Sequence, residues 1–156
     1  MERLRARFLA QPLDVVLHPM PSEDEKTQPR RPAADTQLPA VSAQEWLERG
    51  FRRDTQDLSG KIADYTEAIR LDPTLAVAYN NRGDALAAKG EHDRAIQDYD
   101  RAVAINPAYA EAYNRRGVAH EAKGDRERAI ADFKSAAAID GNQVSRDALK
   151  RLGANP

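Results

Sequence analysis

The side chains best suited to chemistry in this 156-residue chain are three histidines, a few serines and many carboxylates. His18, His92 and His120 are widely separated, and none is accompanied by a second histidine or a carboxylate in a recurring metal-ligand spacing. Asp98 and Asp100 lie two residues apart, so they point to different faces of a helix. We therefore predict no catalytic site, no metal and no cofactor, and we expect the chain not to be an enzyme. His120 is expected to pack against a neighbouring helix.

Asparagines offer another chemistry, because each side-chain amide can donate hydrogen bonds to, and accept them from, the backbone of an extended peptide. Asn80, Asn81 and Asn114 occur in stretches where neighbouring residues fall at spacings of three, four and seven, which is one face of a helix. Such a face can also be a solvated polar surface that binds nothing. The predicted peptide-binding groove consists of Leu47, Phe51, Val77, Asn80, Asn81, Asp84, Glu111, Asn114, Arg115 and Val118.

These candidate residues lie in a sequence that repeats every 34 residues. The stretch from Ala76 to Pro107 aligns with that from Ala110 to Gly141, and 17 positions of the 34-residue unit are identical. A fixed period of this length indicates a repeat architecture. Within each unit, aromatic residues and alanines fall on an inner face, one glycine permits close helix approach, and a second glycine ends the first helix. Ile105 and Ile139 should close the core, and Pro107 ends the earlier unit. In order, the matching residues are Tyr79 and Tyr113, Gly83 and Gly117, Gly90 and Gly124, Ala95 and Ala129, Tyr99 and Phe133, Ala102 and Ala136, and Ile105 and Ile139.

This order of residues resembles the tetratricopeptide repeat family. The resemblance implies an all-α fold, a right-handed solenoid of three helix-turn-helix repeats whose first helices line a concave groove. We expect a disordered tail and linker over residues 1–41, repeats over 42–75, 76–109 and 110–143, and a capping helix with the C-terminus over 144–156. The expected helices of the repeats are Ala43–Thr55, Gly60–Leu71, Ala76–Lys89, Asp93–Ile105, Ala110–Lys123 and Glu127–Ile139.

The first repeat departs from the regular pattern. Trp46 and Gly50 match the aromatic residue and the glycine of the second repeat at a spacing of 33 residues, so its turn should be one residue shorter. Lys61 stands where the other repeats carry a small alanine. Ser42 and Glu45 have the spacing of a capping box, which predicts the start of the first helix. On the inner face of the second half we expect Ile62, Tyr65, Ala68, Ile69 and Leu71.

The two ends of the chain have different expected roles. Residues 21–41 are rich in proline and charge and cannot bury enough apolar surface to fold alone. Leu13 to Leu17 can be read as a short strand, a docking motif, or a tail segment that folds over the groove. At the other end, Val144, Ala148, Leu149 and Leu152 form one apolar stripe of a capping helix.

Composition narrows the classes of partner. The chain carries 24 Lys and Arg against 25 Asp and Glu, so no overall field attracts nucleic acid or a membrane surface. It has no cysteine, which excludes disulfides and thiolate metal sites. No apolar run approaches the length of a membrane span, about 18 residues or more. We expect a cytoplasmic protein with a protein or peptide partner.

The resemblance also bears on the ligand. Some family members hold the C-terminal carboxylate of heat-shock chaperones with two lysines, an arginine and two asparagines. Asn81 and Arg115 match two of those positions, but Leu47, Phe51 and Glu111 occupy the other three. Because carboxylates outnumber arginine on this face, a neutral or basic segment is the better ligand.

Arg82 and Arg116 stand where the family usually carries leucine. Both share a helical face with an aromatic residue, Tyr79 or Tyr113. We expect their aliphatic stems to cover the aromatic rings while the guanidinium groups reach water. A direct role in binding is the alternative.

The functional prediction is a protein–protein interaction adaptor or scaffold that holds an extended peptide or a partner helix in its concave groove. One alternative is a structural module whose stacking faces drive self-association. Another is a non-catalytic auxiliary subunit of an enzyme complex. The expected state is a monomer or a weakly self-associating chain.

Overall fold

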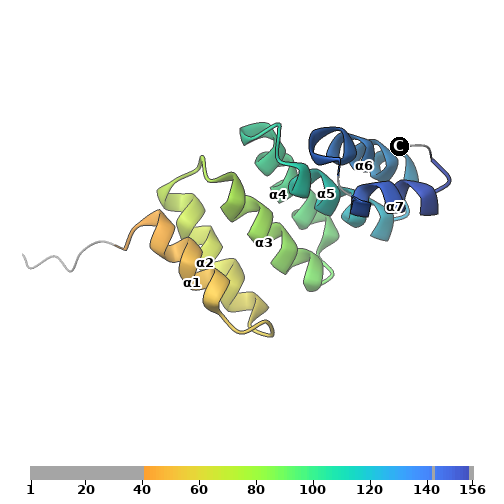
Figure 1. Cartoon of the computed structure of the whole chain (residues 1–156). Helices are drawn as coiled ribbons and strands as arrows, with labels where there is room; N and C mark the ends of the chain where they lie inside the picture. Colours follow the sequence, from red (N-terminus) through yellow and green to blue (C-terminus); the bar gives the residue numbers. More distant parts are fainter. Residues whose placement is uncertain (1–40, 142, 155–156) are drawn as a thin grey trace, which may run out of the picture. The chain divides into compact units, whose positions relative to one another are not determined.

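The computed structural model describes residues 41–141 and 143–154, and all regular structure in this part of the chain is helical (Figure 1). The predicted disordered tail, including Leu13 to Leu17, lies outside the described residues, apart from position 41. The all-α fold expected from the sequence is confirmed. Within the described residues, no helix has the length and apolar character needed to cross a lipid bilayer.

In the described part of the chain, six helices follow one another as three pairs, and a seventh comes last. The first helix of the second and third pairs packs on its own partner and on the second helix of the preceding pair, as α3 does on α4 and α2 (Figure 1). A last single helix, α7, packs on α6. The helices are α1 (Ala43–Arg52), α2 (Leu58–Leu71), α3 (Ala76–Ala88), α4 (His92–Ile105), α5 (Ala110–Ala122), α6 (Arg126–Asp140) and α7 (Gln143–Arg151).

Glycines let the two helices of a pair approach closely. A Cβ atom on Gly83 would lie 2.6 Å from Cε1 of Tyr99, and one on Gly117 would lie 2.9 Å from Cε1 of Phe133. The aromatic ring therefore occupies the space that the missing side chain leaves. Gly90 ends its helix in the left-handed region, with φ of 80°, which favours glycine. The predicted roles of these glycines are confirmed.

The predicted end of α1 is wrong by three residues. The helix ends at Arg52 instead of Thr55, and α2 begins at Leu58 instead of Gly60. The cause is local capping, because the Asp57 side chain accepts a hydrogen bond from the Gly60 backbone N–H at 2.9 Å and starts α2 early. The capping box of Ser42 and Glu45 at the start of α1 is present as predicted.

The helix ends are less buried than the pattern suggested. Ile105 and Ile139, predicted to close the core, and Leu71, predicted on the inner face, are exposed large hydrophobic residues, because they lie in the last turns of their helices. In α7, Val144 is also exposed, and Ser145 is buried in its place. The packed core consists mainly of alanines around Tyr65, Leu86, Tyr99, Phe133 and Leu149.

Candidate functional site

A hollow of about 320 Å³ lies between the first two repeats. Three of the predicted groove residues, Phe51, Asn81 and Asp84, line it together. Phe51 comes from α1 and is 74% exposed, while the other two come from α3 and are half-buried. An apolar ring, an amide and a carboxylate therefore converge on one recess. The complete lining is Phe51, Thr55, Leu58, Lys61, Tyr65, Asn81, Asp84 and Ala85.

Asp84 connects this recess to the third repeat. Its Oδ1 accepts a hydrogen bond from the Tyr99 hydroxyl at 2.8 Å. The same oxygen lies 3.6 Å from Nε of Arg115, whose Nη2 lies 3.4 Å from Oε1 of Glu111. Arg115 is thus held between two carboxylates, one from α3 and one from its own helix α5. Its charge is already balanced before any ligand arrives.

Burial controls the protonation of this cluster. Desolvation raises the pKa of Asp84, and Glu111 adds to the effect, while the Tyr99 hydrogen bond and Arg115 oppose it. Burial also raises the pKa of Tyr99 and of Tyr109, with nearby carboxylates contributing. Desolvation penalises a charge of either sign, and Glu111 additionally disfavours a second negative charge beside Asp84. A further carboxylate is therefore a poor complement to this cluster.

The asparagines do not share one environment. Asn81 lines the recess, but Asn80 is only 1% exposed, so the prediction that its amide faces a ligand is wrong. The spacing placed it on the groove face, yet the neighbouring helices cover it. Among the described residues, Oδ1 of Asn80 and Oδ1 of Asn114 are buried without a hydrogen-bond partner. Asn114 as a whole is half-buried.

The remaining predicted residues lie outside the recess lining. Leu47 is half-buried, and Glu111 is exposed beside Arg115. Val77 and Val118 are exposed on α3 and α5. The structure therefore brings together two subsets, one around Phe51 and one around Arg115, and Asp84 belongs to both.

The sequence did not predict that residues of α2 and of the turn between α1 and α2 would line the recess. Thr55, Leu58, Lys61 and Tyr65 all line the recess. The signal that could have found them was present at Lys61, because a long cationic side chain at a position of small alanines must reach out of the hairpin.

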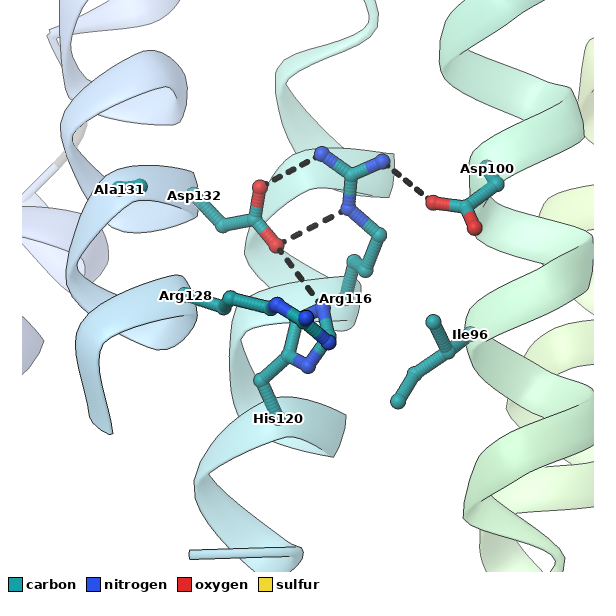
Figure 2. A pocket seen from close by; sticks show the side chains of 7 residues that line it. All are labelled: Ile96, Asp100, Arg116, His120, Arg128, Ala131 and Asp132. Carbon is teal, nitrogen blue, oxygen red and sulfur yellow. Dashed lines mark hydrogen bonds and ion pairs between the residues drawn. The ribbon is translucent and has the colours of Figure 1, made fainter. Parts of the chain in front are cut away.

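Arg82 and Arg116 bind buried aspartates, which corrects the prediction that their guanidinium groups reach water. Nε and Nη2 of Arg82 donate to the two carboxylate oxygens of Asp98 at 2.8 and 2.7 Å. Arg116 donates to Asp132 in the same way at 3.0 and 2.6 Å (Figure 2). The arginines also lie near the rings of Tyr79 and Tyr113, so that part of the prediction holds.

The same arginines connect neighbouring repeats. Nη1 of Arg82 donates to the Thr66 hydroxyl at 3.1 Å, and Nη1 of Arg116 donates to Oδ1 of Asp100 at 2.6 Å. Figure 2 shows Arg116 between Asp132 of α6 and Asp100 of α4, with His120 below it. His120 is buried, as predicted, and its Nε2 lies 3.9 Å from Asp132.

The first repeat achieves the same pairing with two arginines. The Asp64 side chain is fully buried and accepts hydrogen bonds from Arg49 and Arg53. Burial acts to raise the pKa of Asp64, but the two arginines outweigh it and lower the pKa to about 2. Arg49 also stacks over the Trp46 ring, 3.7 Å from its centroid. Since these groups satisfy one another, we regard them as structural.

No group of three or more histidines, aspartates or glutamates converges as a metal site within residues 41–141 and 143–154. The arrangement around Phe51 and Asp84 suits recognition of a peptide, through apolar contact, hydrogen bonding and charge.

Comparison with known proteins supports the family. Family models described as "Tetratricopeptide repeat" match residues 64–97 and 110–143, and one described as "TPR repeat" matches residues 83–124. No curated protein sequence matches the chain.

Several solved structures share the fold. The Arabidopsis OM64 TPR domain is 31% identical, with a TM-score of 0.70, and the alignment covers 72% of this chain and 94% of that one. The first TPR of Spaghetti (RPAP3), bound to the HSP90 peptide SRMEEVD, is 28% identical, with a TM-score of 0.69 and coverage of 72% and 90%. MamA is 32% identical, with a TM-score of 0.62 and coverage of 65% and 60%. Together with the 34-residue period and the paired helices, these matches show that the chain belongs to the tetratricopeptide repeat family of protein–protein interaction modules.

Proposed function

We propose that this chain is an adaptor that binds an extended, neutral-to-basic segment of a partner protein across its first helices. The observation that carries the proposal is the recess in which the exposed Phe51 ring lies with Asp84. An apolar side chain of the ligand rests against Phe51, and a basic side chain approaches Asp84. The amide of Asn81 contributes hydrogen bonds to the ligand backbone.

Charge around the recess supports this ligand over an acidic one. Arg115 is the arginine nearest to Asp84, and Asp84 and Glu111 already neutralise it. A ligand carboxylate would have to displace one of these groups and would meet the other. The HSP90 peptide SRMEEVD in the RPAP3 structure is acidic towards its C-terminal end. Leu47 and Phe51 stand where chaperone-binding relatives carry other side chains. These two residues therefore favour a partner other than a chaperone C-terminus.

A peptide titration tests the proposal. Labelled peptides that contain one leucine and two lysines are compared with peptides in which glutamates replace the lysines, using fluorescence anisotropy and the full chain. We expect the basic peptide to bind at least about tenfold more tightly. Phe51→Ala should weaken it, because most of the apolar contact is lost.

Val144→Ala is the matched control, since Val144 is an exposed apolar residue on α7, far along the chain from the recess. It should leave the affinity unchanged. Tighter binding of the acidic peptide that Phe51→Ala also weakens would contradict the proposal, as would equal binding of the basic peptide by the Phe51→Ala variant and the parent chain.

A further inference from the structure

Three hollows lie along the second helices, away from the Phe51 recess, and they differ in charge. The hollow of about 570 Å³ beside α3 and α4 is lined by two arginines, Arg82 and Arg101, and two aspartates, Asp98 and Asp100. Its formal side-chain charge is therefore balanced. Two of the four charged side chains, Arg82 and Asp98, form an ion pair with each other.

The next hollow, of about 370 Å³, has the same balance (Figure 2). Arg116 and Arg128 face Asp100 and Asp132, and the buried His120 completes the polar lining. Arg116 is bonded to both aspartates. The formal charges of the lining side chains cancel in each of these two hollows, so neither has a net charge that would attract a charged ligand.

The hollow between α6 and α7, of about 540 Å³, is different. It is lined by three cations and no carboxylate, with alanines of α6 between them. None of the ten predicted peptide-groove residues lines it. Its lining is Lys134, Ala137, Ala138, Gln143, Arg146 and Lys150.

The repeat pattern explains this excess of positive charge. Thr66, Asp100 and Lys134 occupy the same position in successive repeats. The first two accept a hydrogen bond from the arginine of the following repeat, but an ammonium group has no acceptor. The position of Arg82 and Arg116 is occupied in α7 by Lys150. The arginine link between repeats is therefore absent here, and two cations, Lys134 and Lys150, line the hollow together.

Two of the three cations are not neutralised by any described residue. Lys134 and Arg146 are exposed and form no ion pair within residues 41–141 and 143–154. Lys150 has only a long contact, 3.9 Å, between its Nζ and Asp147. Asp147 also accepts a hydrogen bond from Gln143, and it does not line the hollow.

We propose that the hollow between α6 and α7 is a second docking site, which binds an acidic segment of a partner protein. Glutamate or aspartate side chains of the segment pair with Lys134, Arg146 and Lys150, and their methylene groups lie on Ala137 and Ala138. A protein segment fits better than nucleic acid, because the cations form one small cluster on a chain whose net charge is −1. This site does not depend on the Phe51 recess.

The test uses the full chain and a short fluorescein-labelled peptide of consecutive Asp and Glu residues, with a matched Asn and Gln peptide. We expect the acidic peptide to bind at least about tenfold more tightly, with an affinity that falls as salt is added. The variant K134Q/R146Q should reduce the affinity at least about tenfold. Its thermal melt should not change, since neither side chain has a described ion-pair partner.

The matched control R94Q/R101Q removes the same number of charges from exposed positions on α4 and should leave binding unchanged. Equal binding of the two peptides overturns the proposal, as does an equal loss in the control variant. Phosphatidylserine vesicles or single-stranded DNA could bind more tightly than the acidic peptide, through a site that K134Q/R146Q weakens. That result would overturn the assignment to a protein partner.

The chain itself contains one short acidic run, Glu23 to Glu25. Changing its carboxylates to amides should leave the affinity for the acidic peptide unchanged if the occupant belongs to another protein. If this change raises the affinity for the acidic peptide more than about tenfold, the chain's own segment is the occupant, and the proposal of a separate partner is overturned.

Discussion

Arg116 and Asp132 form a two-bond ion pair in which Nε and Nη2 donate to the two carboxylate oxygens at 3.0 and 2.6 Å (Figure 2). Both side chains are largely covered, so neither charge can be left alone without a large desolvation cost. The third nitrogen of Arg116 reaches Asp100 in the preceding repeat. The Arg116 side chain therefore links the two helices of its own pair, α5 and α6, and joins this pair to α4 of the preceding repeat.

Arg116→Leu should destabilise the protein by about 3–5 kcal/mol, although leucine is the residue that the family usually carries there. The reason is that Asp132 would remain buried without its partner. The double variant R116L/D132L should recover most of the loss, because no uncompensated charge remains. Urea unfolding followed by circular dichroism measures both values.

The control for this experiment is Arg128→Leu, which alters the same hollow but affects only an ion pair with the nearby Asp125. Its expected effect is within about 0.5 kcal/mol. A single Arg116→Leu variant as stable as the parent would show that the buried pair is not required.

Gly117→Leu should cost about 1–3 kcal/mol through overpacking, because even its Cβ atom would lie 2.9 Å from the Phe133 ring. Ala122→Leu places the same side chain at an exposed position of α5 and should have little effect. Thermal melts of the two variants give the comparison. If both variants melt at the same temperature, the close approach of α5 and α6 does not limit stability.

The low pKa of Asp64 predicts a loss of stability in acid. A folded-state pKa of about 2 lies below the ordinary value of 3.8, so the stabilisation is fully present above that ordinary value and is lost as the pH falls towards 2. The loss from this group is on the order of 2 kcal/mol. Urea unfolding at pH 5 and pH 2 measures it. Asp64→Asn should show a smaller change across the same interval, and an identical change would assign the acid sensitivity to other groups.

Binding of a basic peptide should weaken on acidification earlier than an ordinary carboxylate would cause. The pKa of Asp84 is raised by burial, so this side chain loses its charge at a higher pH than an exposed aspartate. The dissociation constant of a lysine-containing peptide, measured from pH 7 downward, should increase as Asp84 becomes protonated. Asp84→Asn should bind weakly throughout and lack this dependence. An unchanged pH profile in that variant would place the basic side chain elsewhere.

Much of the fold could be predicted because its determinants are local or periodic. The 34-residue repeat identified the helix pairs, and Gly83 and Gly90 marked a close contact and a turn. Ser42 and Glu45 indicated the first helix start. In each case the side chain acts within its own helix or pair, so one repeat is enough to reveal it.

The site was less predictable because it depends on which neighbour covers each helix face. Helical spacing placed Asn80 with Asn81, yet adjacent helices bury only the former. The arginine–aspartate pairs join residues 16 positions apart, as in Arg82 and Asp98, which helical spacing does not indicate. Their recurrence in successive repeats was visible in the sequence, and it was the usable signal.

The links from arginine to the preceding repeat also set the order in which the array frays. Arg82 binds a neutral hydroxyl of Thr66, whereas Arg116 binds the carboxylate of Asp100, and hydrogen bonds between charged groups are stronger. At the far end, Arg151 on α7 pairs with Glu121 of α5. Of the two junctions that an arginine links to the preceding repeat, the one between α2 and α3 is therefore the weaker. The amides of α1 and α2 should exchange with solvent together and before those of α3 to α6, as one hairpin that opens while these four helices stay folded.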